Sequence, residues 1–203
     1  MREELPSIAQ TKFDFWGHEG VILRSYDIKK KQGPFSICCN PVTQIRLRAE
    51  LCRLFGRSKV KLIAAVIDKV RHNAQYSTPS NPYYLAVQFV LERIFMMTGA
   101  GTSVVFESRG KAEDEIVRGW ADSVSAGDNF RHQQFGFSIS FAKKKWNVGG
   151  LQIADLACQP IIHYVEQPKT DRKDWLAVHA RMRTNWLGKL DGYGLKVFPA
   201  QKS

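Results

Sequence analysis

The chain lacks a long hydrophobic run, because no apolar stretch among its 203 residues reaches the roughly 20 residues that a membrane span needs. The N-terminal segment 1–6 also lacks the apolar core of a secretory signal. Internal repeats and low-complexity segments are absent as well. These absences predict a soluble, cytoplasmic protein with no membrane partner.

Cysteine is scarce, and no Cys-x-x-Cys pair occurs. Small buried thiols in a reducing compartment are therefore favoured over disulfides or a zinc site; the four cysteines are Cys38, Cys39, Cys52 and Cys158. Hydrophobic residues make up an ordinary 44% of the chain, enough for one well-filled core. We predict a single domain over residues 1–203, with a core of about 12–165 and a basic C-terminal extension over 166–203.

Positive charge is present in excess and is unevenly spread. The formal net charge is +11, with +7 in residues 1–80, 0 in residues 81–165 and +4 in residues 166–203. Basic flanks around a neutral centre can attract a polyanion such as nucleic acid. An ordinary solvated basic surface explains the charge equally well.

Hydrophobic periodicity predicts alternating strands and helices. Asn81-Pro82 is typical of a helix start, and Gly99 and Gly101 mark the exit of that helix. Other helices are expected over 41–55, 111–124, 150–164 with a bend at Pro160, and 174–187. Strands are expected over 59–68, 102–106 and 135–141, with shorter candidates at 13–16 and 21–23 and a basic turn at 29–34.

The order of these elements from residue 59 to residue 164 predicts an α/β layer fold with some parallel strand pairing. In such sheets ligands gather beyond the carboxyl ends of the strands. Glu107 follows the apolar run 104–106 and is expected at such an end.

Two acids stand in settings where a carboxylate needs a partner. Asp155 lies among small and apolar positions of the helix expected at 150–164, and Glu107 ends a strand before Ser108-Arg109-Gly110-Lys111. Together they can hold a divalent ion that acts on a phosphodiester. The alternative is that Glu107 caps a turn or pairs with Arg109, and that Asp155 pairs with a nearby base.

Four blocks of the chain resemble the domain-of-unknown-function 3800 family. They are Asn81-Pro82-Tyr83, Leu91-Glu92-Arg93, Val105–Lys111 with Glu113-Asp114, and Gly150–Leu156, and a closing Gly192–Pro199 is also similar. The blocks occur in the family's order and cover roughly residues 12–200. They are specific in combination and weak singly.

The resemblance implies a ribonuclease H-like mixed sheet flanked by helices, with acidic residues that hold Mg²⁺ or Mn²⁺ for phosphodiester cleavage. Glu107 takes the place of the acid that ends the fourth strand, and Asp155 that of the acid on the last helix. Members of the family usually begin with a strand ending in Asp-Glu-Ser-Gly, which this sequence does not contain. The fold is therefore expected to be incomplete at its N-terminal strand, through truncation or loss.

A further acidic ligand has three candidates. Asp27 ranks first, because Leu23-Arg24-Ser25 before it is similar to a family block that commonly reads Leu-His-Ser followed by an acid. In this chain arginine stands in place of the histidine. Asp68 at the end of the strand at 59–68 ranks second, and Glu92 third. Surface or salt-bridge roles are the alternative for each.

Basic residues near the two acids are candidates for binding nucleic acid. Lys143, Lys144 and Lys145 with Trp146 suit phosphate contact and base stacking, and Arg109 and Lys111 can reach a scissile phosphate. A solvated hairpin end, with Trp146 packed on the core, is the alternative for the first group. Neutralisation of Glu107 is the alternative for the second.

Three functional hypotheses follow. The first is a metal-dependent phosphodiesterase or nuclease acting on nucleic acid. The second is a catalytically inactive module that binds nucleic acid or a protein through the same scaffold. The third is a structural subunit, either a homo-oligomer or a chain whose open sheet edge is completed by a partner chain.

Overall fold

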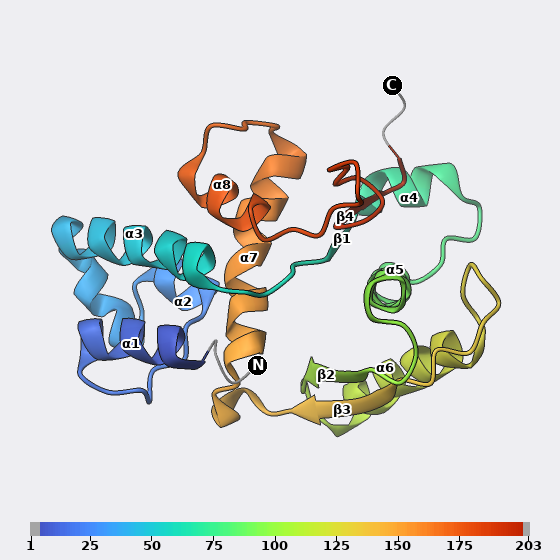
Figure 1. Ribbon diagram of the computed structural model, residues 1–203, viewed down its shortest axis with the longest axis horizontal. Helices are drawn as coiled ribbons and strands as arrows, with labels where there is room; N and C mark the ends of the chain where they lie inside the picture. The colour runs from blue at the N-terminus through green and yellow to red at the C-terminus, as the bar shows by residue number, and fades with distance from the viewer. Residues whose placement is uncertain (1–4, 201–203) are drawn as a thin grey trace. The chain divides into compact units, whose positions relative to one another are not determined.

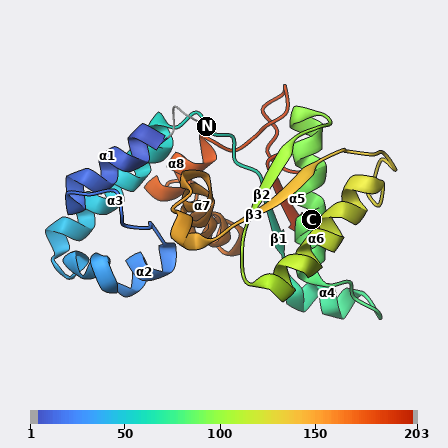
Figure 2. The same ribbon diagram turned by 90° about the horizontal axis from the view of Figure 1, so that it is seen from below.

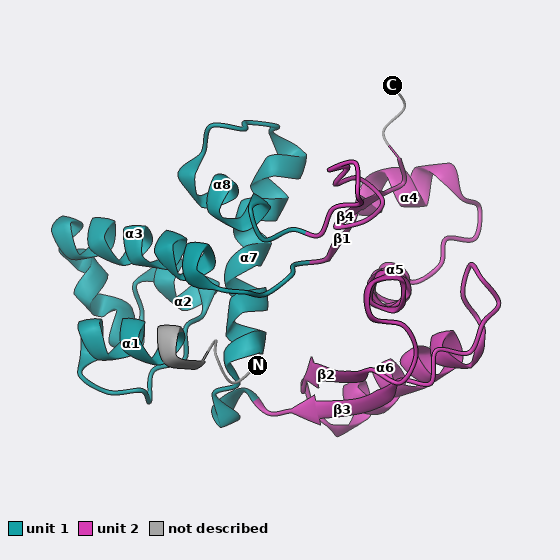
Figure 3. Cartoon of the chain, viewed as in Figure 1, with its two compact units in different colours: residues 1–62, 144–182 teal, residues 63–143, 183–203 magenta. Residues whose placement is uncertain are grey.

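The computed structural model describes residues 5–200 and the side chains of residues 8–200. The chain divides into two compact units (Figure 3), unit 1 with residues 1–62 and 144–182 and unit 2 with residues 63–143 and 183–203. Single-domain organisation stays a prediction. The segment 166–203, expected as a basic extension, is shared between the units: α8 (Lys173–His179) belongs to unit 1 and β4 (Leu195–Phe198) to unit 2.

Unit 1 is helical over its described residues (Figure 1). Asn40 caps its longest N-terminal helix, because the Asn40 side chain accepts hydrogen bonds from the amides of Val42 and Thr43 at 2.9 and 3.3 Å, and Pro41 occupies the first helical position. Its elements are α1 (Leu5–Trp16), α2 (Ser25–Lys30), the 3₁₀ helix η1 (Gly33–Cys39), α3 (Pro41–Arg57), the 3₁₀ helix η2 (Lys144–Trp146), α7 (Gly149–Glu166) and α8.

Unit 2 contains two pairs of parallel strands. In the first pair, β1 (Ala64–Ile67) lies beside β4. In the second, β2 (Ser103–Glu107) lies beside β3 (Ser138–Ala142), with Ser103 opposite Ser138 and α6 (Lys111–Ala126) as the crossover. The remaining helices of unit 2 are α4 (Lys69–Gln75) and α5 (Pro82–Thr98).

The core of unit 2 forms where α5 and α6 pack together and against the β2–β3 pair. Its buried side chains come from both helices and from the segment before β3: Val87, Leu91, Val117, Ala121, Val124, Phe135 and Phe137. Phe95 stacks on Phe135 with ring centroids 4.1 Å apart. This packing holds the carboxyl end of β2, where Glu107 lies.

The α/β class and the parallel pairing are confirmed. The helices expected from Asn81-Pro82, from residue 111 and from residue 150 are present as α5, α6 and α7, and α7 continues through Pro160 to Glu166. The ribonuclease H-like mixed sheet stays a prediction, since the described strands form two separate two-stranded sheets. In residues 5–200, no helix is both long and apolar enough to cross a membrane.

Several local predictions were wrong. Residues 13–16, expected as a strand, end helix α1, and residues 21–23 belong to no helix or strand. A short aromatic run fits either a helix or a strand by periodicity, and here Gly17 at φ 74° ends a helix. The basic turn expected at 29–34 instead begins inside α2, and the long strand and helix expected at 59–68 and 174–187 shrink to 64–67 and 173–179.

Candidate functional site

Asp155 is half-buried on α7, and its hydrogen-bond partner is the protein backbone. The amide of Ser25, at the start of α2, donates to Oδ2 of Asp155 at 2.7 Å, and the Ser25 hydroxyl donates to the backbone carbonyl of Asp155 at 2.8 Å. A carboxylate placed there stabilises the first amide of a short helix. The Asp155 carboxylate was expected to need a partner, and that partner is a residue 130 positions away in the sequence.

The first turns of α7 extend this contact into a polar network. Gln152, which is buried, accepts from the amide of Leu23 at 2.9 Å and donates to Oδ1 of Asn147 at 2.8 Å. The same Oδ1 accepts from Nζ of Lys12 on α1 at 2.7 Å. Burial lowers the pKa of Lys12, and the negative charge of Glu19 opposes that effect. The network ties α1 and segment 23–25 to α7.

Replacement of Asp155 separates this structural role from any role in binding a ligand. We expect Asp155→Ala to lower the free energy of unfolding by about 1–3 kcal/mol, because the Ser25 amide loses a charged acceptor. Asp155→Asn keeps an oxygen for that amide and is expected to lose less than half as much. Urea unfolding curves of both variants measure this. Equal stability of Asp155→Ala and the unmodified protein would contradict it.

Glu107 ends β2 and is half-buried. It lies opposite Ala142 in the parallel register, and the amide of Ser108 then donates to the carbonyl of Ala142 at 3.0 Å. This places Glu107 at the carboxyl end of a strand, as the sequence predicted. Glu107 belongs to unit 2 and Asp155 to unit 1, and their joint binding of one cation stays a prediction.

The loop after Glu107 is held by Asp114 from the first turns of α6. Oδ2 of Asp114 accepts from the Ser108 hydroxyl at 2.6 Å, and Oδ1 accepts from the amide of Arg109 at 2.9 Å. The exposed Arg109 guanidinium lies 4.8 Å from the ring centroid of Tyr83. Lys111 is exposed at the first position of α6. Arg109 and Lys111 therefore both face solvent near the end of β2.

Asp114 makes the stability of this loop dependent on pH. The hydrogen bond from Ser108 is the main cause that holds the pKa of Asp114 below its ordinary value of 3.8, so the stabilisation is complete above that value and is lost as the pH falls through the lower folded pKa. Below pH 4 we expect Asp114→Asn to lose stability less steeply than the unmodified protein. Melting temperatures between pH 2 and pH 6 measure this; identical slopes would contradict it.

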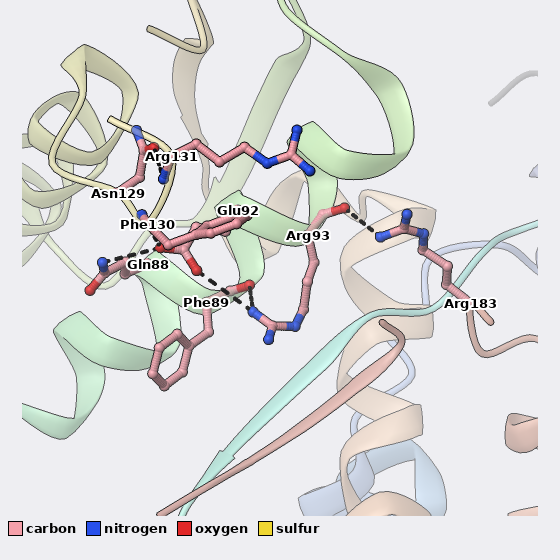
Figure 4. A network of polar contacts seen from close by, with 8 residues as sticks. All are labelled: Gln88, Phe89, Glu92, Arg93, Asn129, Phe130, Arg131 and Arg183. Carbon is pink, nitrogen blue, oxygen red and sulfur yellow. Dashed lines mark hydrogen bonds and ion pairs between the residues drawn. The ribbon is translucent and has the colours of Figure 1, made fainter. Parts of the chain in front are cut away.

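The candidates for a further acidic ligand have protein partners. Asp27 lies 3.4 Å from Nη1 of Arg24, and Asp68 caps α4 by accepting from the amide of Arg71 at 3.0 Å. Glu92 is buried and accepts from the amide of Phe130 at 3.1 Å (Figure 4). All three carboxylates thus form ion pairs, as the sequence left open, and Asp68 also caps α4; a ligand role for them stays a prediction.

Among the described residues, the structure shows no preformed cluster of metal-ligating side chains. No group of three or more His, Cys, Asp or Glu side chains within residues that the structure describes comes together in a way that can hold an ion. Asp155 accepts from Ser25, and the partners of Asp27, Asp68, Glu92 and Asp114 are given above. Mg²⁺ or Mn²⁺ binding therefore stays a prediction, and no catalytic step is derived from it.

The basic segment after β3 is mostly exposed. Lys143 and Lys145 are exposed, Lys144 is half-buried, and Trp146 exposes 59% of its surface. Packing of Trp146 into the core, one of the alternatives from the sequence, is therefore wrong. The segment is a 3₁₀ turn that leads into α7, and Trp146 presents its ring to solvent.

Sequence reasoning missed a cavity between α1 and α3, which lie side by side (Figure 2). Its volume is about 360 Å³, and its lining residues are Asp14, Phe15, Arg46, Glu50 and Arg53. The spacing of Arg46, Glu50 and Arg53 does indicate one face of a helix. The hydrophobic pattern did not indicate that α1 packs beside this face of α3, because it predicted a strand at residues 13–16.

The two units differ in charge. By sequence, unit 1 contains 18 Lys or Arg and 10 Asp or Glu residues, a net charge of +8, whereas unit 2 contains 12 and 9, a net charge of +3. Most of the positive charge therefore belongs to the helical unit that contains the α1–α3 cavity.

Comparison with known proteins adds no assignment, because no family model, curated protein or solved structure matches the chain.

Proposed function

We propose that this protein binds nucleic acid through the basic surface of unit 1. The observation that carries the proposal is the concentration of charge, a net +8 in unit 1 against +3 in unit 2. Lysine and arginine that neutralise phosphates release counterions from the nucleic acid, which provides affinity without base recognition. The exposed ring of Trp146 beside Lys145 adds a stacking surface of the kind that single strands use.

Three exposed arginines lie along one face of α3. Arg46, Arg53 and Arg57 are exposed and follow one another at intervals of seven and four residues, which are about 10 and 6 Å along a helix axis. Arginine presents a planar fork that matches phosphate oxygens, so a row of such forks can follow a strand of phosphates. If the charge were only an ordinary solvated basic surface, replacement of lysines in either unit would weaken nucleic-acid binding equally.

Charge reversal tests the proposal. A labelled single-stranded oligonucleotide is titrated with the protein and binding is followed by fluorescence anisotropy. The double variant Lys61→Glu/Lys145→Glu in unit 1 is expected to weaken binding about tenfold or more. Lys69→Glu/Lys189→Glu in unit 2 changes the net charge equally and is the matched control; all four lysines are exposed. Equal losses in the two variants would contradict a binding surface on unit 1.

A second candidate is metal-dependent phosphodiester hydrolysis. The placement of Glu107 at the carboxyl end of parallel strand β2, with Arg109 and Lys111 exposed beyond it, favours this candidate. Single-stranded, double-stranded and hybrid substrates are incubated with Mg²⁺ or Mn²⁺ and with Glu107→Gln and Asp155→Asn variants. Cleavage that both variants abolish supports it, and cleavage that neither variant changes removes these two acids from the site.

A further inference from the structure

The cavity between α1 and α3 combines an aromatic ring with two arginines. Phe15 comes from α1, and Arg46 and Arg53 come from α3. The Arg46 guanidinium lies 5.6 Å from the ring centroid of Phe15. A volume of about 360 Å³ lies at the lower end of the range of small-molecule pockets.

A buried carboxylate orients one arginine of this cavity, Arg53, and also the neighbouring Arg57. Glu50 is only 7% exposed, and its two oxygens lie 2.8 Å from Nη1 of Arg53 and 3.2 Å from Nη1 of Arg57. The two guanidinium groups themselves are largely exposed. A carboxylate that holds arginines from below leaves their outer N–H groups for an anion and reduces the entropy that binding would cost.

Phe15 is also held in place. Its ring centroid lies 5.7 Å from that of Trp16, and the indole N–H of Trp16 donates to the carbonyl of Pro34 at 2.8 Å. Asp14 also lines the cavity, and its Oδ1 accepts from Gln10 at 2.7 Å. Because Glu50 and Asp14 are both acidic, an anionic group of a ligand is repelled except on the arginine side of the cavity, and the group beside Phe15 must be uncharged.

We propose that this cavity holds one nucleotide of a single-stranded nucleic acid, with its base against Phe15 and its phosphate on Arg46 and Arg53. This inference rests on the proposed nucleic-acid binding and specifies its substrate class. A base within a duplex is stacked and paired, whereas a base in a single strand is free to leave its neighbours and stack on an aromatic side chain. The cavity therefore favours single strands over duplexes of the same sequence.

The test compares binding of a single-stranded oligonucleotide and of the matched duplex. Phe15→Leu is expected to weaken binding of the single strand about tenfold, since stacking of a base contributes that much, and to change duplex binding less than about twofold. Arg46→Gln is expected to weaken single-strand binding about fivefold or more by removing a phosphate contact. Phe13→Leu and Arg48→Gln are matched controls on the same two helices, both exposed and both outside the cavity lining.

The outcomes separate the two proposals. One outcome would overturn the nucleotide site and leave the proposed function standing. In that outcome the unmodified protein binds the single strand, Phe13→Leu and Phe15→Leu change binding equally, and Arg46→Gln does not weaken it. Absence of binding by the unmodified protein would overturn both. Thermal melting checks that each variant is folded, and Arg46→Gln, an exposed change on α3, tests the site even where Phe15→Leu lowers stability.

Discussion

Replacement of Gly194 by alanine is expected to lower the free energy of unfolding by about 3 kcal/mol or more. An alanine Cβ there would overlap the carbonyl oxygen of Arg183 and lie 2.9 Å from the carbonyl carbon and the amide nitrogen of the same residue. The Gly194 backbone is also fixed on both sides, because its amide donates to the carbonyl of Leu190 at 2.9 Å and its carbonyl accepts from the amide of Ala64 at 2.7 Å. The clash therefore meets backbone that has little freedom to move.

Gly119→Ala is the matched control for this variant. Gly119 lies within α6, and an added Cβ there would meet nothing within 4 Å. Alanine is a better helix former than glycine, so this variant is expected to gain about 0.5–1 kcal/mol. Urea unfolding curves of both variants provide the comparison. A Gly194→Ala protein within about 0.5 kcal/mol of the unmodified one would show that the close approach of Gly194 to Arg183 is absent.

Glu92→Ala is expected to cost about 3 kcal/mol, because it leaves the buried Arg93 guanidinium without its counter-ion and the Phe130 amide without its acceptor. Glu92 and Arg93 expose only 5% and 8% of their surfaces. One carboxylate oxygen of Glu92 accepts from the amide of Phe130 at 3.1 Å, and the other lies 3.8 Å from Nη1 of Arg93 (Figure 4). Burial lowers the pKa of Arg93, and the charge of Glu92 opposes that effect.

The Glu92→Gln variant isolates the contribution of charge. It keeps an oxygen for the Phe130 amide and removes the ion pair with Arg93, so it is expected to be more stable than Glu92→Ala by about 1 kcal/mol or more. Unfolding in urea measures both variants. Equal stability of the two would mean that the amide of Phe130 does not depend on Glu92.

The sequence predicted the elements whose ends carry their own chemical signal. Asn81 followed by Pro82 caps α5 with residues adjacent in sequence, and Gly110 precedes α6 with acids in its first turn. Residues 13–16 carry no such signal, and a run of three aromatics around one acid fits a strand as well as a helix. The strands at 64–67 and 138–142 are shorter than expected because the length of a strand depends on how far its partner strand runs beside it. The hydrophobic pattern of one segment does not specify that partner.

The candidate site was predicted only in part. Asp155 was expected to need a partner, and it has one, but the Ser25 amide is brought to it by tertiary packing that no local pattern encodes. Glu107 was placed correctly at a strand end, because strand polarity and the following turn are both local features. The α1–α3 cavity could not be predicted, since it requires Phe15 to lie on a helix and that helix to pack on α3.

The salt dependence of binding to a single-stranded oligonucleotide tests the central claim most directly. If the arginine face of α3 and other basic residues of unit 1 contact three to five phosphates, log K is expected to fall with log salt concentration with a slope of about −2 to −3.5. The Arg46→Gln/Arg53→Gln variant is expected to make that slope shallower by about 1 to 1.5. Binding with a slope near zero, or no binding at low salt, would contradict the account.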